Sequence, residues 1–131
     1  MTRFLLLVFV IIVGWELLWT LFGVKLMFPW ELKRILAEDG IKPILLDVRT
    51  PQEFSAFHIE GAVNQPEMLA GKGEIHNVFA GQKIVFICMS GHRSPIAAYV
   101  FHKKGMKNVY HLSGGMLGYK LLGGETEGGA Q

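Results

Sequence analysis

The chain opens with one long apolar stretch and continues as short apolar runs separated by polar turns. Residues 4–22 carry a single charge, Glu16, and as a helix they would reach about 28 Å, close to the thickness of a bilayer core. This stretch predicts one transmembrane helix, and residues 1–24 are assigned to an N-terminal anchor. No pair of small residues follows at the spacing that signal peptidase requires, which favours a retained anchor; a cleaved signal peptide and a buried amphiphilic helix are the alternatives. We expect Glu16 to be a tolerated misfit near the helix end, the alternatives being a protonated carboxyl group, one that reaches the nearer interface, or one paired with another chain.

Beyond the anchor, predicted strands alternate with predicted helices. The strands are residues 25–28, 44–48, 62–65, 83–87 and 109–112, and the helices are residues 30–38, 51–57, 94–104 and 116–121. This alternation is typical of an α/β fold with three layers, in which helices cover both faces of a central parallel sheet. Residues 25–122 therefore form the folded domain. The Gly- and Glu-rich residues 123–131 predict a disordered tail.

Composition excludes several classes of function. The chain has 13 Lys and Arg against 11 Asp and Glu, and its basic residues are scattered, so we expect no nucleic-acid interface. Cys88 is the only cysteine, which excludes an intramolecular disulfide and a thiolate-rich zinc site. The histidines lack ligand spacing, and we expect neither a metal nor a cofactor. More basic residues follow the apolar stretch than precede it, which favours a cytoplasmic domain.

Cys88 is the candidate nucleophile. It directly follows the predicted strand 83–87 and begins a loop that leads into the predicted helix at Ser94. The carboxyl ends of parallel strands and the N-termini of helices meet at the sheet edge where α/β proteins bind ligands. Gly91 allows the loop to curl, so that its N–H groups form an anion-binding nest. We expect this nest, together with Arg93, to favour the Cys88 thiolate.

Several separated blocks resemble the rhodanese family of sulfurtransferases over residues 25–121. The blocks are Leu46-Asp47-Val48-Arg49 with Glu53-Phe54, His58-Ile59 with Gly61-Ala62 and Asn64, Cys88 with Gly91, Arg93 and Ser94, and Gly105, Asn108-Val109, Leu112 and Gly114-Gly115. The sequence departs from the family pattern at Phe57, Glu60 and Tyr119, where glycine, proline and tryptophan are usual. None of these departures lies in the Cys88 loop.

The resemblance implies a rhodanese-like fold and a sulfurtransferase activity. Cys88 would take a sulfane sulfur from thiosulfate or a persulfide and hold it as its own persulfide. It would then pass the sulfur to a thiol, to cyanide or to a sulfur-accepting protein. Backbone donors from Met89 to Arg93 would surround the sulfur as an oxyanion hole surrounds oxygen. We expect a membrane-attached monomer.

The loop and its neighbours have expected roles. Arg93 would attract the anionic donor or brace the loop, and Ser94 would cap the helix or, less favoured, hydrogen-bond the sulfur. Asp47 would accept hydrogen bonds at the base of the loop, Arg49 would pair with Glu53, and His58 would be structural. His111 would lie at the surface or be partly buried. The substrate-binding residues would be Met89, Ser90, Gly91, His92 and Ser94, with His92 facing either the mouth of the site or solvent.

Two other functions remain as alternatives. Phosphatases and arsenate reductases of this fold need arginine at the sixth position after cysteine, whereas Arg93 is at the fifth. The smaller cradle fits one sulfur atom better than a tetrahedral oxyanion. The second alternative is a membrane-tethered docking module without catalytic activity, which would not need Cys88.

Overall fold

Five parallel strands form the central sheet of the structure, a computed structural model that describes residues 1–129. They are β1 (Lys25–Met27), β2 (Ile44–Asp47), β3 (Val63–Asn64), β4 (Ile84–Ile87) and β5 (Val109–Leu112), in the spatial order β1-β5-β4-β2-β3. Every pair of neighbours is parallel. All strands therefore present their carboxyl ends at one edge, and Cys88, which follows the central strand β4, lies in the middle of that edge.

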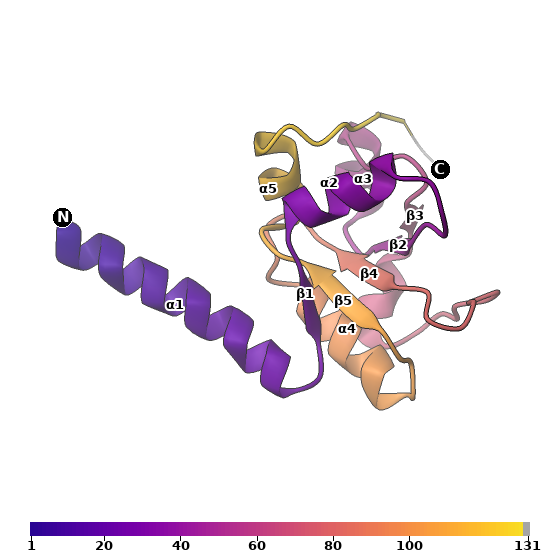
Figure 1. The fold of residues 1–131 in the computed structure, drawn as a ribbon, viewed down its shortest axis with the longest axis horizontal. Coiled ribbons are helices and arrows are strands. Elements are labelled where there is room, and N and C mark those ends of the chain that lie inside the picture. Colours follow the sequence, from indigo (N-terminus) through magenta and orange to yellow (C-terminus); the bar gives the residue numbers. More distant parts are fainter. Residues whose placement is uncertain (130–131) are drawn as a thin grey trace.

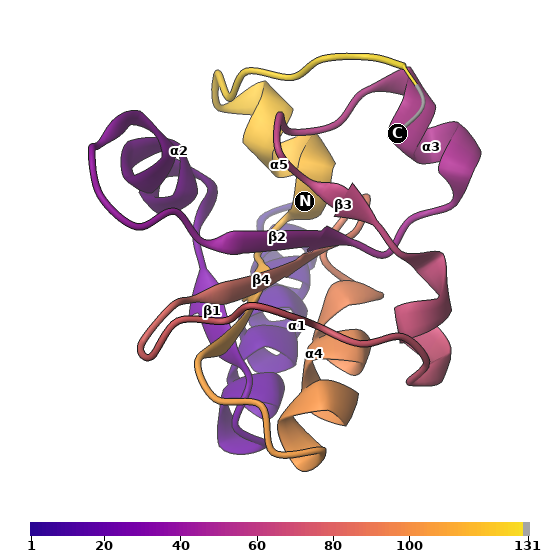
Figure 2. The same ribbon diagram turned by 90° about the vertical axis from the view of Figure 1, so that its right-hand side faces the viewer.

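Helices cover both faces of the sheet, which confirms the α/β architecture (Figures 1 and 2). One face carries α2 (Pro29–Ala37), α3 (Pro51–Ala56) and α5 (Gly115–Leu121), and the other carries α4 (Ser94–Lys103) and the short 3-10 helix η1 (Pro66–Ala70). The C-terminal part of the long N-terminal helix α1 (Thr2–Leu21) lies on the same side as α4.

The residues of β4 alternate between the two cores. Ile84 and Phe86 point toward α4, and Cys88 continues this row, whereas Val85 and Ile87 point toward α2 and α5. All of them are buried, which explains why this strand is a continuous apolar run in the sequence. The same alternation on β5 turns Val109 toward the α4 side. The Cys88 side chain therefore begins on the face of the sheet that α4 and α1 share.

Helix α1 is long and apolar enough to cross a membrane, and a signal sequence can have the same length and composition. Residues 4–13 are exposed along its projecting part (Figure 1). Its last turns contact the domain, because Trp19 packs on the core beside α4 with its ring 6.1 Å from that of Tyr99. Only a tight turn separates the helix from β1, so no flexible linker joins the two.

Two segments differ from the sequence-based expectation. Residues 66–70 form η1, an element that the sequence did not predict. Its Met68 is buried in the core on the α4 side of the sheet. The tail runs from α5 toward α3, and Glu127 and His58 exchange two backbone hydrogen bonds of 2.8 Å (Figure 1). Composition alone predicted disorder here, but these bonds give residues 123–129 a defined path. Residues 130–131 of the predicted tail lie outside the described part of the chain.

His58 has the structural role expected from its sequence. Its Nδ1 lies 2.8 Å from the carbonyl oxygen of Phe54, and its Nε2 lies 3.1 Å from a carboxylate oxygen of Glu127. Its ring also stacks on the Phe54 ring, with 3.8 Å between the centroids. His58 thus joins α3 to the C-terminal segment, away from the Cys88 loop.

Candidate active site

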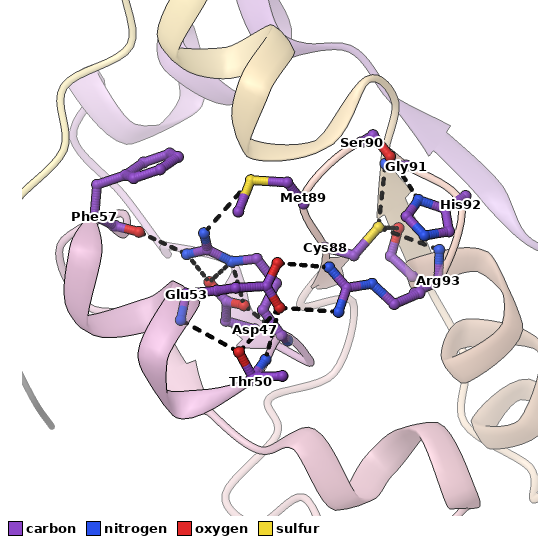
Figure 3. Close-up of polar contacts among 12 residues, drawn as sticks. Asp47, Thr50, Glu53, Phe57, Cys88, Met89, Ser90, Gly91, His92 and Arg93 are labelled. Carbon is purple, nitrogen blue, oxygen red and sulfur yellow. Dashed lines mark hydrogen bonds and ion pairs between the residues drawn. The ribbon is translucent and has the colours of Figure 1, made fainter.

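The loop after β4 curls around the sulfur of Cys88 (Figure 3). The backbone N–H groups of Gly91 and Arg93 donate to Sγ at 3.1 and 3.3 Å, and Ser94 Oγ lies 3.4 Å from Sγ. The Cys88 side chain is fully buried among these three groups, of which the two N–H groups donate to Sγ and Ser94 Oγ accepts from it. The anion-binding nest predicted from Gly91 is therefore present, and the atom that it holds is the sulfur of the single cysteine, the expected nucleophile.

The start of α5 fixes the loop from behind. The N–H groups of Met116 and Leu117 donate to the carbonyl oxygens of Cys88 and Met89 at 2.9 and 3.0 Å. Gly115 (φ +60°) leaves no room for a side chain, since a Cβ there would meet the Met89 carbonyl group at 2.5 Å. A Cβ on Gly91 (φ +84°) would likewise lie 2.9 Å from the backbone nitrogen of Gly114. These close approaches explain why glycine occupies both positions.

Arg93 braces the loop, which was one of its two expected roles. Its guanidinium donates to both carboxylate oxygens of Glu53 on α3, at 3.0 and 2.9 Å (Figure 3). This hydrogen-bonded pairing is the main reason that the pKa of Glu53 falls from 4.5 to about 2, and the same pairing raises the pKa of Arg93. The negative charge of ionised Cys88 raises the pKa of Arg93 further. Arg93 Nε is buried and has no hydrogen-bond partner within residues 1–129.

Asp47 and Arg49 form a buried ion pair below the loop. Arg49 Nε and Nη2 donate to the two carboxylate oxygens of Asp47 at 2.9 and 2.8 Å, and Nη2 also donates to the carbonyl oxygen of Phe57. The expected pairing of Arg49 with Glu53 is wrong. Arg49 precedes Thr50, the N-cap of α3, and so does not share the helix surface with Glu53. Asp47 is an acceptor, as expected, and its carboxylate accepts from the backbone N–H, Nε and Nη2 of Arg49.

Ser94 does not cap α4, contrary to the favoured expectation. Arg93 occupies the cap position, with no capping bond from its side chain, and Ser94 is the first, fully buried residue of the helix. Ser94 Oγ instead lies between Cys88 Sγ and Nδ1 of His111, which is 3.3 Å away. The expectation for His111 is also wrong, because β5 turns this residue inward and buries it completely.

Glu16 on α1 is paired within the chain and is not a tolerated misfit. Its Oε2 lies 2.7 Å from Nε2 of His111, and its Oε1 accepts a hydrogen bond from Ser113 Oγ at 3.1 Å. The preceding residue, Trp15, donates from Nε1 to the carbonyl oxygen of Gly91 at 3.2 Å. Sequence reasoning missed this site because the partners are 95 residues apart. The available signal was the lone charge in an apolar helix, which calls for a partner.

A pocket of about 410 Å³ lies between α1 and the Cys88 loop. The helix contributes Ile11, Ile12 and Trp15, and the loop contributes Ser90, Gly91 and His92. His92 is exposed, with Nδ1 2.5 Å from Ser90 Oγ, and it faces this pocket. Two of the five expected substrate-binding residues do not line this pocket: Ser94 lies at Cys88 Sγ, and Met89 Sδ lies 4.0 Å from Arg49 Nη1. Within residues 1–129, no cluster of three or more His, Cys, Asp or Glu residues could hold a metal.

Comparison with curated proteins gives relatives of moderate identity. A probable adenylyltransferase/sulfurtransferase of Mycobacterium tuberculosis is 35% identical over 92 residues, which are 70% of this chain and 23% of that protein. An uncharacterized protein of Synechocystis is 32% identical over 95 residues, which are 72% of this chain and 51% of that protein. The chain thus spans about half, or less, of the length of these relatives.

Solved structures share the fold. A rhodanese-related protein from Thermoplasma volcanium superposes with a TM-score of 0.66 at 24% identity, covering 79% of this chain and 97% of that one. The thiosulfate sulfurtransferase of Pseudomonas aeruginosa gives a TM-score of 0.61 at 24% identity, covering 81% of this chain and 20% of that one. A family model for the rhodanese-like domain matches residues 29–122. With this match over most of its length, and with this fold, the chain belongs to the rhodanese-like domain family.

Proposed function

We propose that the protein is a rhodanese-type sulfurtransferase that carries a sulfane sulfur on Cys88. The observation that supports this most directly is the pair of backbone N–H groups, of Gly91 and Arg93, that donate to Sγ at 3.1 and 3.3 Å. Backbone donors stabilise a thiolate, which is the attacking form of cysteine. They would equally stabilise the anionic outer sulfur of a persulfide.

The proposed reaction has two transfers. The Cys88 thiolate attacks the outer sulfur of thiosulfate, and the S–S bond of the donor breaks as sulfite leaves with the electron pair. A thiol, cyanide or a sulfur-accepting protein then attacks the outer sulfur of the Cys88 persulfide, and Cys88 leaves as the thiolate. The sulfur is thus transferred by covalent catalysis without net oxidation.

The geometry favours sulfur chemistry over phosphate chemistry. A phosphatase uses its loop arginine to bind the oxygens of the substrate, but both terminal nitrogens of Arg93 donate to Glu53. A protein of Rhodopseudomonas palustris with this fold is named a possible tyrosine phosphatase, at a TM-score of 0.69 and 24% identity over 80% of this chain and 86% of that one. That likeness concerns the fold alone. A docking module without catalytic activity would not require a cysteine whose sulfur accepts hydrogen bonds from two backbone N–H groups.

The proposed setting of this reaction is a membrane surface. Helix α1 would remain attached as a single-pass anchor. The domain would face the cytoplasm, because four basic residues follow the helix (Lys25, Lys33, Arg34 and Lys42), against Arg3 and the α-amino group before it. The partners would be small sulfur donors and acceptors or a sulfur-accepting protein, and the chain would act as a monomer.

Substitution of Cys88 tests the function directly. The full-length chain in detergent should transfer sulfur from thiosulfate to cyanide, and incubation with thiosulfate should add about 32 Da to Cys88 in the mass spectrum. Cys88→Ser should abolish both signals with an unchanged thermal unfolding midpoint, because the hydroxyl is similar in size to the thiol. Residual sulfur transfer by Cys88→Ser near the wild-type rate would contradict the proposal.

A further inference from the structure

We propose that Glu16, carried by the N-terminal helix, is a positioning residue that promotes ionisation of Cys88 through His111 and Ser94. This inference rests on the proposed function, because it takes Cys88 as the nucleophile. It assigns the apolar helix a part in the chemistry in addition to any part in membrane attachment.

Four side chains from four parts of the fold form a continuous hydrogen-bonded row. Cys88 Sγ lies 3.4 Å from Ser94 Oγ, Ser94 Oγ lies 3.3 Å from His111 Nδ1, and His111 Nε2 lies 2.7 Å from Glu16 Oε2. Cys88, Ser94 and His111 are fully buried, and the Glu16 side chain is 12% exposed. Solvent therefore cannot easily replace any link of the row.

A single proton assignment satisfies every contact in the row. With its proton on Nε2, His111 donates to the carboxylate of Glu16 and presents Nδ1 as an acceptor. Ser94 then donates its hydroxyl proton to Nδ1, and the Cys88 thiol donates to Ser94 Oγ. The carboxylate fixes the imidazole tautomer, as the aspartate does in a catalytic triad.

Proton transfer along the row would generate the thiolate. The thiol proton moves to Ser94 Oγ as the hydroxyl proton of Ser94 moves to Nδ1 of His111. The products are the Cys88 thiolate, a neutral Ser94 and an imidazolium ion paired with the Glu16 carboxylate. No atom is gained or lost, and the charge of the row is unchanged.

The other charged groups near the thiol are already paired. Arg93 is bound to Glu53, and Arg49 is bound to Asp47, in both cases through two carboxylate oxygens. These groups are not free to accept the thiol proton. Around the far end of the row, Ser113 holds the second oxygen of Glu16 at 3.1 Å.

The helix is also held in place beside the row. Trp15 donates to the carbonyl oxygen of Gly91, within the loop that surrounds the sulfur. A lone carboxylate in an apolar helix is unfavourable in lipid, so its retention calls for a partner, which the structure supplies in His111. The contact thus explains a charge that membrane insertion alone does not.

Glu16→Gln tests the inference with a result whose sign is diagnostic. The thiolate absorbance at pH 7 of the full-length chain in detergent reports Cys88 alone, because the chain has one cysteine and Cys88→Ser supplies the blank. Gln removes the charge that stabilises the imidazolium ion, so we expect the thiolate fraction to fall by up to about tenfold. If Glu16 acted only through space, removing its negative charge would raise the thiolate fraction. An increase, or no change, would overturn the inference.

Two further comparisons keep the result interpretable. Glu38→Gln removes an exposed carboxylate distant from the row and should leave the thiolate fraction unchanged. His111→Gln should lower the thiolate fraction at least as much as Glu16→Gln, and the double variant should be no lower than His111→Gln alone. Independent effects of the two substitutions would contradict a path through His111. If Glu16→Gln displaces α1, His111→Gln still decides, because an unchanged thiolate fraction there would refute the row as a proton path.

This measurement is independent of sulfur transfer. A chain that shows the expected thiolate changes but does not transfer sulfur would refute the proposed function and leave the role of Glu16 standing. A chain that transfers sulfur without those changes would refute the role of Glu16 and leave the proposed function standing.

Discussion

The ion pair between Arg93 and Glu53 should be a measurable source of stability at neutral pH. A pKa of about 2 in place of 4.5 corresponds to about 3 kcal/mol for a fully enclosed carboxylate. The two side chains are 25% and 27% exposed, and solvent screening reduces this contribution to about 1–2 kcal/mol. Glu53→Gln retains an acceptor for the Thr50 N–H but loses the charge and one Arg93 contact. We therefore expect the unfolding midpoint to fall by about 5–10 °C.

The pH dependence follows from the direction of this shift. A carboxyl group whose pKa is lowered by folding stabilises the native state above its ordinary pKa, and this stabilisation disappears as the pH falls toward the folded-state value. The difference between the wild type and Glu53→Gln should thus be largest near neutral pH and should shrink between about pH 4.5 and pH 2.

Thermal unfolding followed by circular dichroism, with the full-length chain in detergent from pH 7 to pH 3, measures this difference. Glu38→Gln is the matched control, because its partner Arg34 and Glu38 itself are 61% and 57% exposed and their pairing should contribute little. A Glu53→Gln defect of the same size at pH 3 as at pH 7 would refute an electrostatic origin and would point to the lost hydrogen bond.

Three other substitutions probe the frame of the site. Gly115→Ala should destabilise the chain by about 1–3 kcal/mol and slow sulfur transfer, because its Cβ would displace the Met89 carbonyl; an active, equally stable variant would contradict the close approach. Asp47→Asn should cost about 3–5 kcal/mol in denaturant unfolding, since it leaves the buried charge of Arg49 uncompensated, and a loss below about 1 kcal/mol would show that Arg49 finds another partner. His58→Phe keeps the ring stacking but loses two hydrogen bonds, so proteolysis of residues 123–129 should accelerate by at least several-fold; unchanged proteolysis would show that His58 does not hold this segment.

Local patterns were sufficient to predict the frame of the site. A fully buried strand, a cysteine directly after it and a glycine three residues later all act through neighbouring backbone. The sequence therefore predicted both the parallel sheet and the nest around Cys88. Thr50 with Glu53 three residues later likewise forms a capping box, a local pattern because capping depends on contacts within one helical turn.

Contacts between distant segments could not be predicted in the same way. Sequence spacing paired Glu53 with Arg49, the arginine nearer to it in the chain. In the structure the loop brings Arg93, which is 40 residues away, to Glu53, and Arg49 pairs with Asp47. The inward position of Ser94 depends on the curl of the preceding loop, and the role of His111 depends on how α1 folds back on the domain. Each of these required three-dimensional placement of two independent elements.

The way in which α1 is docked limits the freedom of the whole domain. Residues 2–14, which project before Trp15, would reach about 20 Å as a helix, whereas the hydrocarbon core of a bilayer is about 30 Å thick. A helix of that length is about 10 Å short of the core, so it can span while keeping its contact with His111 only if the loop edge of the domain lies against the membrane and the bilayer thins around it. Amphiphilic sulfur compounds dissolved in the membrane would then meet the pocket without first entering bulk water. A peptidase that removed the helix would release a domain whose His111 has lost its carboxylate.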